Sequence, residues 1–431
     1  MTPVDQGQHP RAWYALLLLM LVALFAYVDR VIVAVLQEGI RADLKLSDTQ
    51  LGTLTGTGFA IFYTFFALPV ARLADVWVRK HVIAIALLIW SLMTAGSGLA
   101  ASFAVLLLLR IGVAIGEAGG APTSHAMISD FFTRNRRATA LSIWGIMMSV
   151  GPMVGFLLGG RLQDMVGWQN TFIILGVAGM LLVPLIVLTL PEPRRGASDG
   201  VAEHGGQAPS LASVLRTIWN LKSFLFLCAG TALHALSYLA ILNWSAPFYQ
   251  RSHGLSATET GDYMGLAIGI GGVAGTLLGG VIADRLGKAN IRWYMIVPAL
   301  ATILTIPLAF VQFLAADLRV SLLAAGLVLA VTHMYIGPVN ATQQSLVPPG
   351  MRAMTSATLV FVTNIVGMGL GPLIAGMISD TLRTGGAGAD SLRYAVLATL
   401  AANVLAAAFY SCSAWLLPRD AEKNRAAAPA D

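Results

Sequence analysis

Charged residues are scarce in this sequence. Asp, Glu, Lys and Arg make up 11% of its 431 residues, against about 25% in an average soluble domain. Hydrophobic residues make up 57%, and the mean hydropathy is +0.74. A balance this apolar excludes an ordinary soluble globular protein and predicts a polytopic membrane protein.

Cysteine is also scarce. The two cysteines, Cys228 and Cys412, both lie in apolar runs, which excludes a disulfide or zinc framework. No two histidines have a metal-ligand spacing, and phosphate-binding loops and nucleophile elbows are absent. The glycine cluster at 269–280 imitates a dinucleotide fingerprint but lies in an apolar run with no preceding strand. We therefore expect no metal, no cofactor and no enzymatic activity.

A cleavable leader is not indicated either. The first apolar run, Trp13 to Leu36, contains Asp29 and Arg30 and is followed by no small-residue cleavage site, so we expect a retained first span. The net charge of +6 fits basic cytoplasmic loops, and we expect no nucleic-acid partner.

Apolar runs long enough to cross a bilayer, about 20 residues each, occur twelve times. They are 13–37, 48–72, 80–102, 106–131, 138–164, 168–190, 222–249, 259–284, 291–313, 318–346, 353–379 and 393–417. A Gly-, Pro-, Ala- and Ser-rich stretch from Pro191 to Ser213 separates six spans from six. The prediction is an all-α membrane protein with an N-terminal six-helix bundle (1–190), a cytoplasmic linker (191–218) and a C-terminal six-helix bundle with a short tail (219–431).

The basic residues predict the orientation. With the N-terminus inside, the cytoplasmic segments hold 18 Lys and Arg and the outer segments hold 7. Both termini and the linker are then cytoplasmic, in a bacterial-type inner membrane. The two remaining basic residues, Arg30 and Arg110, fall within spans.

The two halves resemble each other. ARLADVWVRK (Ala71 to Lys80) follows the second span, and GVIADRLGK (Gly280 to Lys288) follows the eighth. VGPMVGFLLGG (Val150 to Gly160) and LGPLIAG (Leu370 to Gly376) lie in the fifth and eleventh spans. A duplication in the same orientation indicates two parallel repeats around a central axis.

These motifs resemble those of the major facilitator superfamily. GVIADRLGK matches the loop signature of that family closely, whereas the first copy has Ala71, Val76 and Val78 at three signature positions. Within the superfamily the chain resembles the Spinster lipid transporters, through YVDR (Tyr27 to Arg30), RIGVAIGEA (Arg110 to Ala118) and the basic loop RNRRA (Arg134 to Ala138).

Arg110 and Glu117 are seven residues apart, close to two helical turns, so a helix places them on one face. Charges inside a membrane span are costly and usually face a pathway or a partner. The resemblance implies that Asp29 and Arg30 approach them across a central cavity lined by the first, fourth, seventh and tenth helices. We expect Glu117 and Asp29 to carry protons, and both of these acids, both arginines and Tyr27 to bind substrate; the alternative is a purely structural ion pair.

The second half lacks such charges. Polar and aromatic side chains on its seventh and tenth spans form an amphipathic wall in this interpretation, with substrate contacts from His234, Tyr238, Trp244 and His333. The alternative for a lone histidine is a hydrogen-bonded residue of the core.

The duplicated loops suggest a gate. The family precedent is that loop acids latch the cytoplasmic side against helix ends and basic loops, whereas loop charges elsewhere are ordinarily only solvated. The predicted gating residues are Asp75, Arg79, Lys80, Asp284, Arg285, Arg134, Arg136 and Arg352.

The function predicted from these features is proton-coupled, alternating-access transport of an amphiphilic anionic lipid, such as a lysophospholipid or a sphingosine-phosphate-like lipid, in the outward direction. The alternatives are a proton symporter for a small organic or sugar acid, a multidrug/proton antiporter, and a receptor that does not transport. The expected partners are the substrate, protons and membrane lipids, and we expect a monomer.

Overall fold

The computed structural model describes residues 10–193, 217–348 and 351–427, which are almost entirely helical and include no strand. The described chain divides into two compact units. Unit 1 comprises residues 10–46, 58–193 and 255–265, and unit 2 comprises 47–57, 217–254, 266–348 and 351–427. The predicted linker, 191–218, lies largely outside the described residues.

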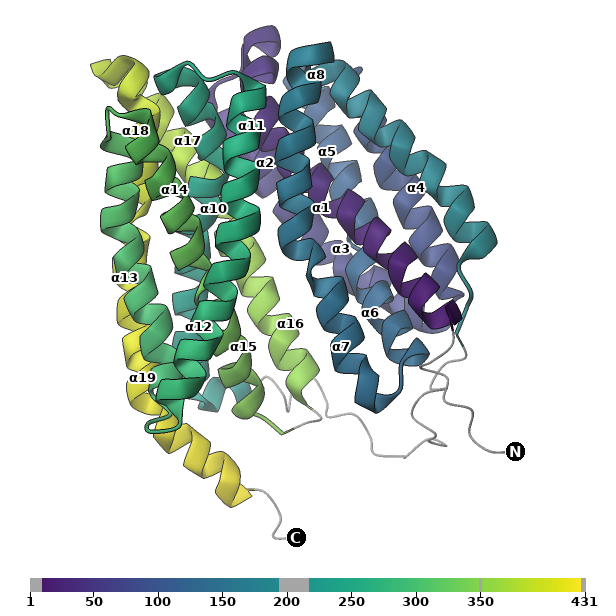
Figure 1. Cartoon of the computed structure of the whole chain (residues 1–431), viewed down its shortest axis with the longest axis vertical. Helices are drawn as coiled ribbons and strands as arrows, with labels where there is room; N and C mark the ends of the chain where they lie inside the picture. The colour runs from purple at the N-terminus through teal and green to yellow at the C-terminus, as the bar shows by residue number, and fades with distance from the viewer. Residues whose placement is uncertain (1–9, 194–216, 349–350, 428–431) are drawn as a thin grey trace. The chain divides into compact units, whose positions relative to one another are not determined.

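Unit 1 is a bundle of helices from the first half of the chain, to which one helix of the second half is added (Figure 1). Its helices, except for one end residue of α3 and of α11, are α1 (Pro10–Leu44), α3 (Thr57–Val76), α4 (Arg79–Ser97), α5 (Phe103–Glu117), α6 (Gly120–Phe131), α7 (Arg134–Gly145), α8 (Met147–Thr189) and α11 (Ala257–Leu266).

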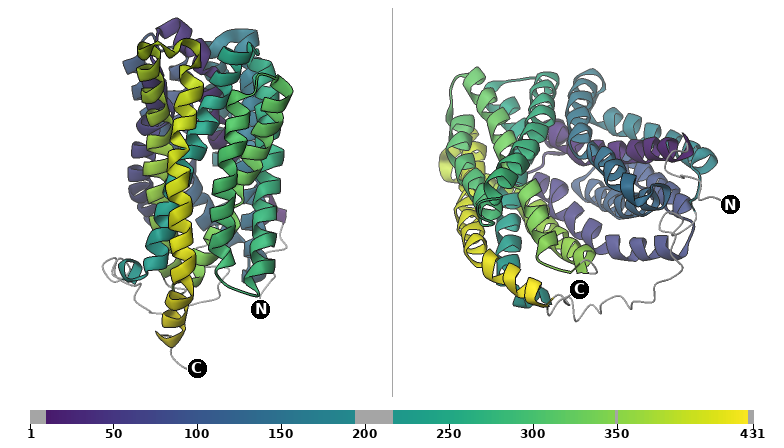
Figure 2. Two further views of the ribbon diagram at one scale, coloured as in Figure 1. Left: turned by 90° about the vertical axis from the view of Figure 1, so that its left-hand side faces the viewer. Right: turned by 60° about the horizontal axis from the view of Figure 1, so that its bottom comes forward.

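Unit 2 contains the rest of the second half and one short helix of the first half, and its long helices run side by side (Figure 2). They are α2 (Asp48–Thr55), α10 (Lys222–His253), the π-helix η2 (Ala267–Gly271), α12 (Gly272–Gly287), α13 (Trp293–Leu314), α14 (Leu318–His333), α15 (Ile336–Ser345), α16 (Arg352–Thr363), the π-helix η4 (Asn364–Leu370), α17 (Gly371–Leu382), the π-helix η5 (Arg383–Ala387), the 3-10 helix η6 (Gly388–Asp390), α18 (Ser391–Thr399) and α19 (Ala401–Ala427).

Eleven helical stretches of the described chain are long and apolar enough to cross a membrane. One of them, Asn135–Thr189, has 55 residues, about 80 Å of helix against a bilayer core of about 30 Å. It breaks at Gly167, whose φ of 79° is in the left-handed region. It therefore contains two spans, and the prediction of a twelve-helix, all-α membrane protein is confirmed.

The fourth and tenth spans, which the sequence predicts as continuous, are among those divided into separate helices. The fourth span is interrupted between α5 and α6, and the tenth between α14 and α15. Pro122 and Pro338 explain both breaks, because they lack the N–H that would bond to the carbonyls of Ala118 and Met334, four residues earlier. The first break leaves Glu117 at the C-terminal end of α5.

Glycines on α8 bring it against α1. A Cβ atom on Gly151 would lie 2.3 Å from the Tyr27 Cβ, and one on Gly155 would lie 2.4 Å from Val31. Small residues at this spacing allow close helix approach in membranes. This packing fixes the rotation of α1, and so the directions in which its charged residues point.

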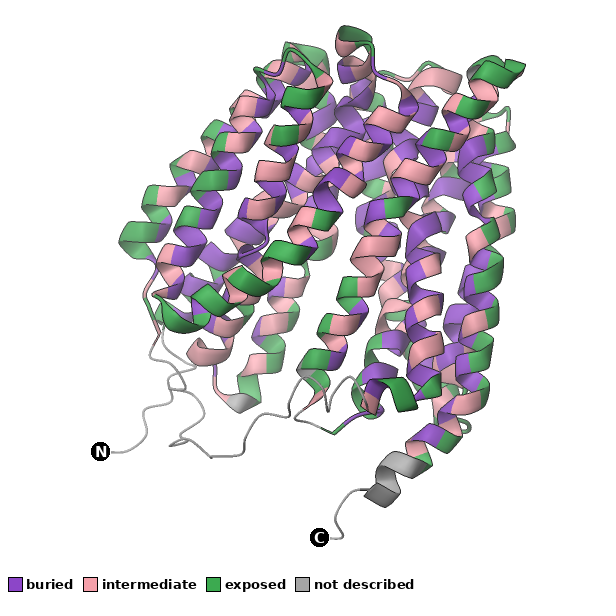
Figure 3. Ribbon diagram, turned by 180° about the vertical axis from the view of Figure 1, so that it is seen from behind, coloured by how far each residue is buried: buried purple, intermediate pink, exposed green. Residues whose placement is uncertain are grey.

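The outer faces of the bundles carry large apolar side chains. Leu181 and Leu188 on α8 are 71% and 81% exposed, and Leu323 on α14 is 72% exposed. Figure 3 shows the alternation along single helices, with buried residues on one face and exposed residues on the other. Such faces belong in contact with lipid, and the chain is a multi-pass membrane protein.

A third pair of similar segments was missed in the sequence: LSDTQLGTLTG (Leu46 to Gly56) matches LSATETGDYMG (Leu255 to Gly265). Each copy starts a helix whose N-terminus is held by an aspartate from the same unit. In unit 2, Asp380 accepts hydrogen bonds from the Thr49 backbone N–H (2.8 Å) and hydroxyl (2.7 Å). In unit 1, Asp164 accepts one from the Thr258 N–H (2.8 Å).

Candidate substrate and proton site

The first ion pair of unit 1 joins Asp29 on α1 to Arg110 on α5. Arg110 Nη1 donates to Asp29 Oδ2 at 2.8 Å, and its Nη2 donates to the Asp29 carbonyl at 3.3 Å. Thr94 on α4 donates its hydroxyl to the other carboxylate oxygen at 2.7 Å. Asp29 and Arg110 are only 4% and 2% exposed, so both members of this pair are buried.

The second ion pair joins the next residue of α1, Arg30, to Glu117 at the end of α5. Arg30 Nε donates to Glu117 Oε2 at 2.6 Å. The guanidinium lies over the Tyr63 ring, 4.3 Å from its centroid, with Tyr27 and Phe59 at 5.4 and 5.5 Å. These aromatic faces stabilise the cation.

Helix geometry explains this division. Asp29 and Arg30 are adjacent and point about 100° apart, so they meet different partners. Arg110 and Glu117, two turns apart on α5, each receive one of them. The structure thus brings together the four charged residues that the sequence singles out within the spans of the first half.

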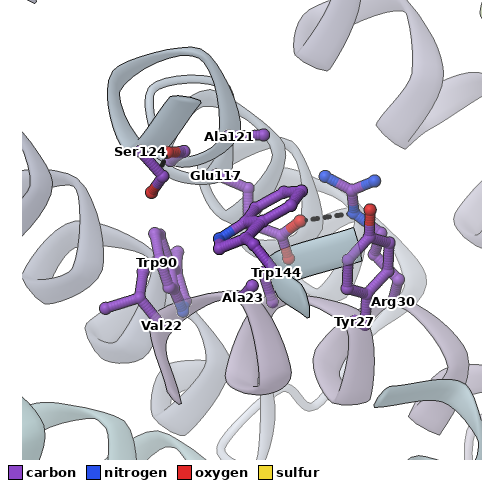
Figure 4. A pocket seen from close by; sticks show the side chains of 11 residues that line it. Val22, Ala23, Tyr27, Arg30, Trp90, Glu117, Ala121, Ser124 and Trp144 are labelled. Carbon is purple, nitrogen blue, oxygen red and sulfur yellow. Dashed lines mark hydrogen bonds and ion pairs between the residues drawn. The ribbon is translucent and has the colours of Figure 1, made fainter. Parts of the chain in front are cut away.

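A pocket of about 320 Å³, counting space open to solvent, lies against the second pair. Its lining includes Arg30, Glu117, Tyr27, Trp90 and Trp144. Figure 4 shows the aromatic rings around the Arg30–Glu117 hydrogen bond and the Arg30 terminal nitrogens directed away from Glu117. We call this the Arg30 pocket. Asp29 and Arg110 are not part of its lining.

Several polar atoms of the site have unused hydrogen-bonding capacity. Glu117 Oε1 is buried and has no hydrogen-bond partner among the described residues. The two terminal nitrogens of Arg30 likewise make no hydrogen bond within the described chain. The site can therefore accept one donor at Glu117 and present two parallel donors at Arg30, the geometry that suits a carboxylate or phosphate.

The predicted substrate residues of the second half lie in unit 2. Two of them are buried and hydrogen-bonded inside it, and their substrate role stays a prediction. His234 is 1% exposed, with its ring nitrogens 3.0 Å from the Thr332 carbonyl and 3.1 Å from the Thr302 hydroxyl. Trp244 is completely buried and donates to the Pro372 carbonyl at 3.0 Å.

The other two are half-buried. The Tyr238 hydroxyl lies 3.4 Å from His333 Nε2, and their rings pack edge to face with centroids 5.1 Å apart. His333 Nδ1 lies 2.7 Å from the Leu329 carbonyl. A substrate role for this pair stays a prediction.

The predicted gating residues sit near helix ends. Arg79 forms an ion pair with Asp130, and the backbone N–H groups of Arg79 and Lys80 donate to the two oxygens of Glu192 at 3.0 and 2.9 Å. In unit 2, Asp284 accepts a hydrogen bond from the Tyr294 hydroxyl at 2.8 Å, and Arg352 donates to the Gln344 carbonyl at 3.1 Å.

The remaining members of that set are Asp75, Arg136 and Arg285, which are exposed, and Arg134, whose side chain lies outside the described residues. The gating role of the whole set stays a prediction.

Several residues of the site were not predicted from the sequence. Thr94 and Trp90 on α4, Phe59 and Tyr63 on α3, and Trp144 on α7 all touch or line it. Aromatic and hydroxyl residues are ordinary within apolar spans, so nothing in their local pattern marks them. Asp130 and Glu192 were also missed, because they are 51 and 113 residues from Arg79 along the chain and no local pattern links them to it.

Comparisons with known proteins agree with this architecture. The family model described as Major Facilitator Superfamily matches residues 18–372. An MFS-type efflux pump of Mycolicibacterium smegmatis is 36% identical over 94% of this chain and 92% of its own. Protein spinster homolog 1 of Homo sapiens is 28% identical over 84% of this chain and 71% of its own.

A solved structure gives the same result. The crystal structure of a bacterial homologue of the human lysosomal transporter Spinster aligns with a TM-score of 0.88 and 28% identity, covering 96% of this chain and 99% of that one.

Twelve spans in two repeats, with paired charges inside one bundle, define the class of membrane transporters. The chain belongs to the Major Facilitator Superfamily. Within it, the Spinster resemblance read from YVDR and RIGVAIGEA is supported by these relatives.

Proposed function

We propose that the protein is a proton-coupled transporter that moves an amphiphilic anionic lipid, of the lysophospholipid or sphingosine-phosphate type, by alternating access. The observation that carries the proposal is Arg30. It lines a pocket, is hydrogen-bonded through Nε alone, and offers two terminal nitrogens that have no hydrogen-bond partner in the described chain.

Proton coupling follows from the Arg30–Glu117 contact. When Glu117 is ionised, it neutralises Arg30 at 2.6 Å. Protonation removes that negative charge and leaves an unbalanced guanidinium, which then favours the phosphate or carboxylate of a substrate. Deprotonation restores the ion pair and weakens substrate binding. Asp29 is the second proposed proton carrier, and its partner Arg110 keeps a supporting role in this scheme.

The lipid class is supported by the pocket lining and by the relatives. Tyr27, Trp90 and Trp144 supply apolar surface beside the charged pair, which suits a ligand with one charged head and one apolar part. The Spinster similarity covers nearly the whole chain. We include Tyr238 and His333 as contacts from unit 2, because they are half-buried and their polar atoms lie 3.4 Å apart.

A drug-efflux function is the second candidate. It is favoured by the 36% identical relative, which is described as an efflux pump, and by a carboxylate beside aromatic rings, which also suits an organic cation. A symporter for a small organic or sugar acid would use the same Arg30 but should reject long acyl chains.

The proposal includes the setting of the transporter. The excess of Lys and Arg on one side supports an inner membrane location with cytoplasmic termini. The six-helix bundles 1–190 and 219–431, joined by the linker, are the moving parts, and the loop residues Asp75, Arg79, Asp284 and Arg285 contribute the cytoplasmic gate.

Flux through reconstituted vesicles tests the function. Purified protein in liposomes is given an inward or outward pH gradient and a radiolabelled lysophospholipid, a short organic acid or a cationic dye. Gradient-driven movement of the lysophospholipid supports the proposal. Movement of only the acid or only the dye replaces it with the corresponding alternative.

A further inference from the structure

A second pocket of unit 1, of about 240 Å³ counting open space, lies between α1, α4 and α8. It is lined by Asp29, Ser91 and Thr94, with Val28 and Leu175 among its apolar neighbours. We call it the Asp29 pocket. Asp29 lines only this pocket, Arg30 and Glu117 line only the other, and Arg110 lines neither.

Trp90 is the residue shared by the two linings. It is 2% exposed and is held by close packing against α5. A Cβ atom on Gly116 would lie 2.8 Å from the Trp90 backbone nitrogen and 2.9 Å from its Cβ. Glycine at 116 is therefore needed for α4 to place Trp90 as the wall between the two pockets.

The Asp29 pocket contains a polar atom without a partner. Ser91 is 2% exposed, and its hydroxyl makes no hydrogen bond to any described residue. A buried hydroxyl left unpaired is costly. Serines in helices commonly bond to the carbonyl four residues earlier, as Ser97 on the same helix bonds to Met93 at 2.9 Å, but Ser91 does not.

The Asp29 carboxylate, which lines the same pocket, can accept more hydrogen bonds than it does. Asp29 Oδ1 accepts from Thr94 and Oδ2 from Arg110, and each carboxylate oxygen can accept a second hydrogen bond. Two groups contact the Asp29 carboxylate, Arg110 from α5 and Thr94 from α4. From α8, the uncharged residues Leu175 and Gly176 line the pocket. Buried water satisfies such groups when a polar cavity offers two to four partners.

We propose that the Asp29 pocket is a hydration site, in which ordered water bridges the Ser91 hydroxyl and the Asp29 carboxylate. Its role rests on the proton coupling proposed above. A hydronium ion in the pocket gives its proton to an Asp29 carboxylate oxygen and remains as neutral water. Asp29 and Glu117 then exchange protons through separate pockets, and Ser91 is a positioning residue for the water of the first.

Hydroxyl-radical footprinting of the purified protein tests the hydration directly and needs no substrate. X-ray radiolysis oxidises side chains next to bound water, so Val28, which is 5% exposed, should be oxidised in the wild type. Val113, which is completely buried and lines neither pocket, should not. S91A should lose most of the Val28 oxidation, whereas S97A, which removes a hydroxyl already bonded within α4, should retain it.

Oxidation of Val28 no greater than that of Val113 in the wild type overturns the proposal, and this comparison stands even if S91A fails to fold. Equal Val28 oxidation in S91A and wild type also overturns it. Protection of Val28 by sodium chloride but not by choline chloride would assign the pocket to a cation instead of water. If Val28 oxidation depends on Ser91 but the protein moves no protons, the proposed proton coupling is wrong and the hydration site is still supported.

Discussion

Glu117 receives Arg30 Nε at 2.6 Å through one carboxylate oxygen and keeps the other buried and unpaired against the same pocket. This asymmetry links the proton and the anionic substrate, the two proposed ligands of the site. The bonded oxygen controls the charge balance of Arg30, and the unpaired oxygen is the one that a proton can occupy without first breaking the ion pair.

The first prediction concerns E117Q. A glutamine keeps the shape of the side chain and cannot release a proton, so gradient-driven accumulation of substrate should be abolished while some substrate exchange remains. Uptake into liposomes with and without a pH gradient measures both. E38Q is the control, because it changes another glutamate of unit 1 in the same way but lies outside both pockets. Normal accumulation by E117Q would remove Glu117 from the coupling scheme.

The second prediction separates the two arginines. R110A leaves Asp29 buried without its cation, which typically costs about 3–5 kcal/mol, so its thermal unfolding temperature should fall well below that of the wild type. R30A also leaves a carboxylate, Glu117, without its cation, but Arg30 is 19% exposed at its side chain and Glu117 lines a pocket that includes open space. Water can therefore replace part of the lost contact, and R30A should unfold closer to the wild type. The double variant D29N/R110M should recover stability. If R110A is as stable as R30A, the buried Asp29–Arg110 pair contributes no more to stability than the Arg30–Glu117 pair, which contradicts this prediction.

The third prediction is that R30K weakens anion binding. Lysine retains the charge but cannot present two parallel donors to one phosphate or carboxylate. We expect affinity to fall by roughly tenfold, about 1.4 kcal/mol. Titration of the purified variant with a lysophospholipid, followed by thermal shift, measures this. Unchanged affinity would indicate that the guanidinium fork makes no direct contact with the ligand.

The fourth prediction tests the repeated helix starts. Asp380 accepts from two backbone N–H groups and a hydroxyl of α2, whereas Asp164 accepts from one N–H of α11. D380N should therefore lower the free energy of unfolding by about 1–2 kcal/mol, the scale of a lost helix cap, and D164N by less. D390N, at a half-exposed aspartate, is the control. Equal effects of all three would show that these contacts are not stabilising.

Much of this organisation could be predicted from the sequence, because the strongest signals are physical extremes. Twelve long apolar runs require twelve spans, and four charges inside them stand out against an apolar background. Which of these charged residues form ion pairs with one another was harder to predict from the sequence. Whether Asp29 or Arg30 meets Glu117 depends on the rotation of α1, which is set by its contact with Gly151 and Gly155 on α8.

Other features could not be predicted because their residues look ordinary in a span. Trp90 resembles any apolar core residue until its position between two pockets is known. The hydrogen bonds that His234 and Trp244 make to backbone carbonyls and a hydroxyl inside unit 2 are equally invisible in the local sequence, and the substrate role of both residues stays a prediction. The repeat at Leu46 and Leu255 was present in the sequence and needed only a systematic search for internal similarity.

Ligand-induced thermal stabilisation tests the central claim most directly. Purified wild type and R30A would be screened with lysophospholipids and short organic acids at two pH values. The account predicts stabilisation of the wild type by lysophospholipids, more strongly at the lower pH, and its loss in R30A. Stabilisation by short acids alone, or an equal lysophospholipid response in R30A, would contradict it.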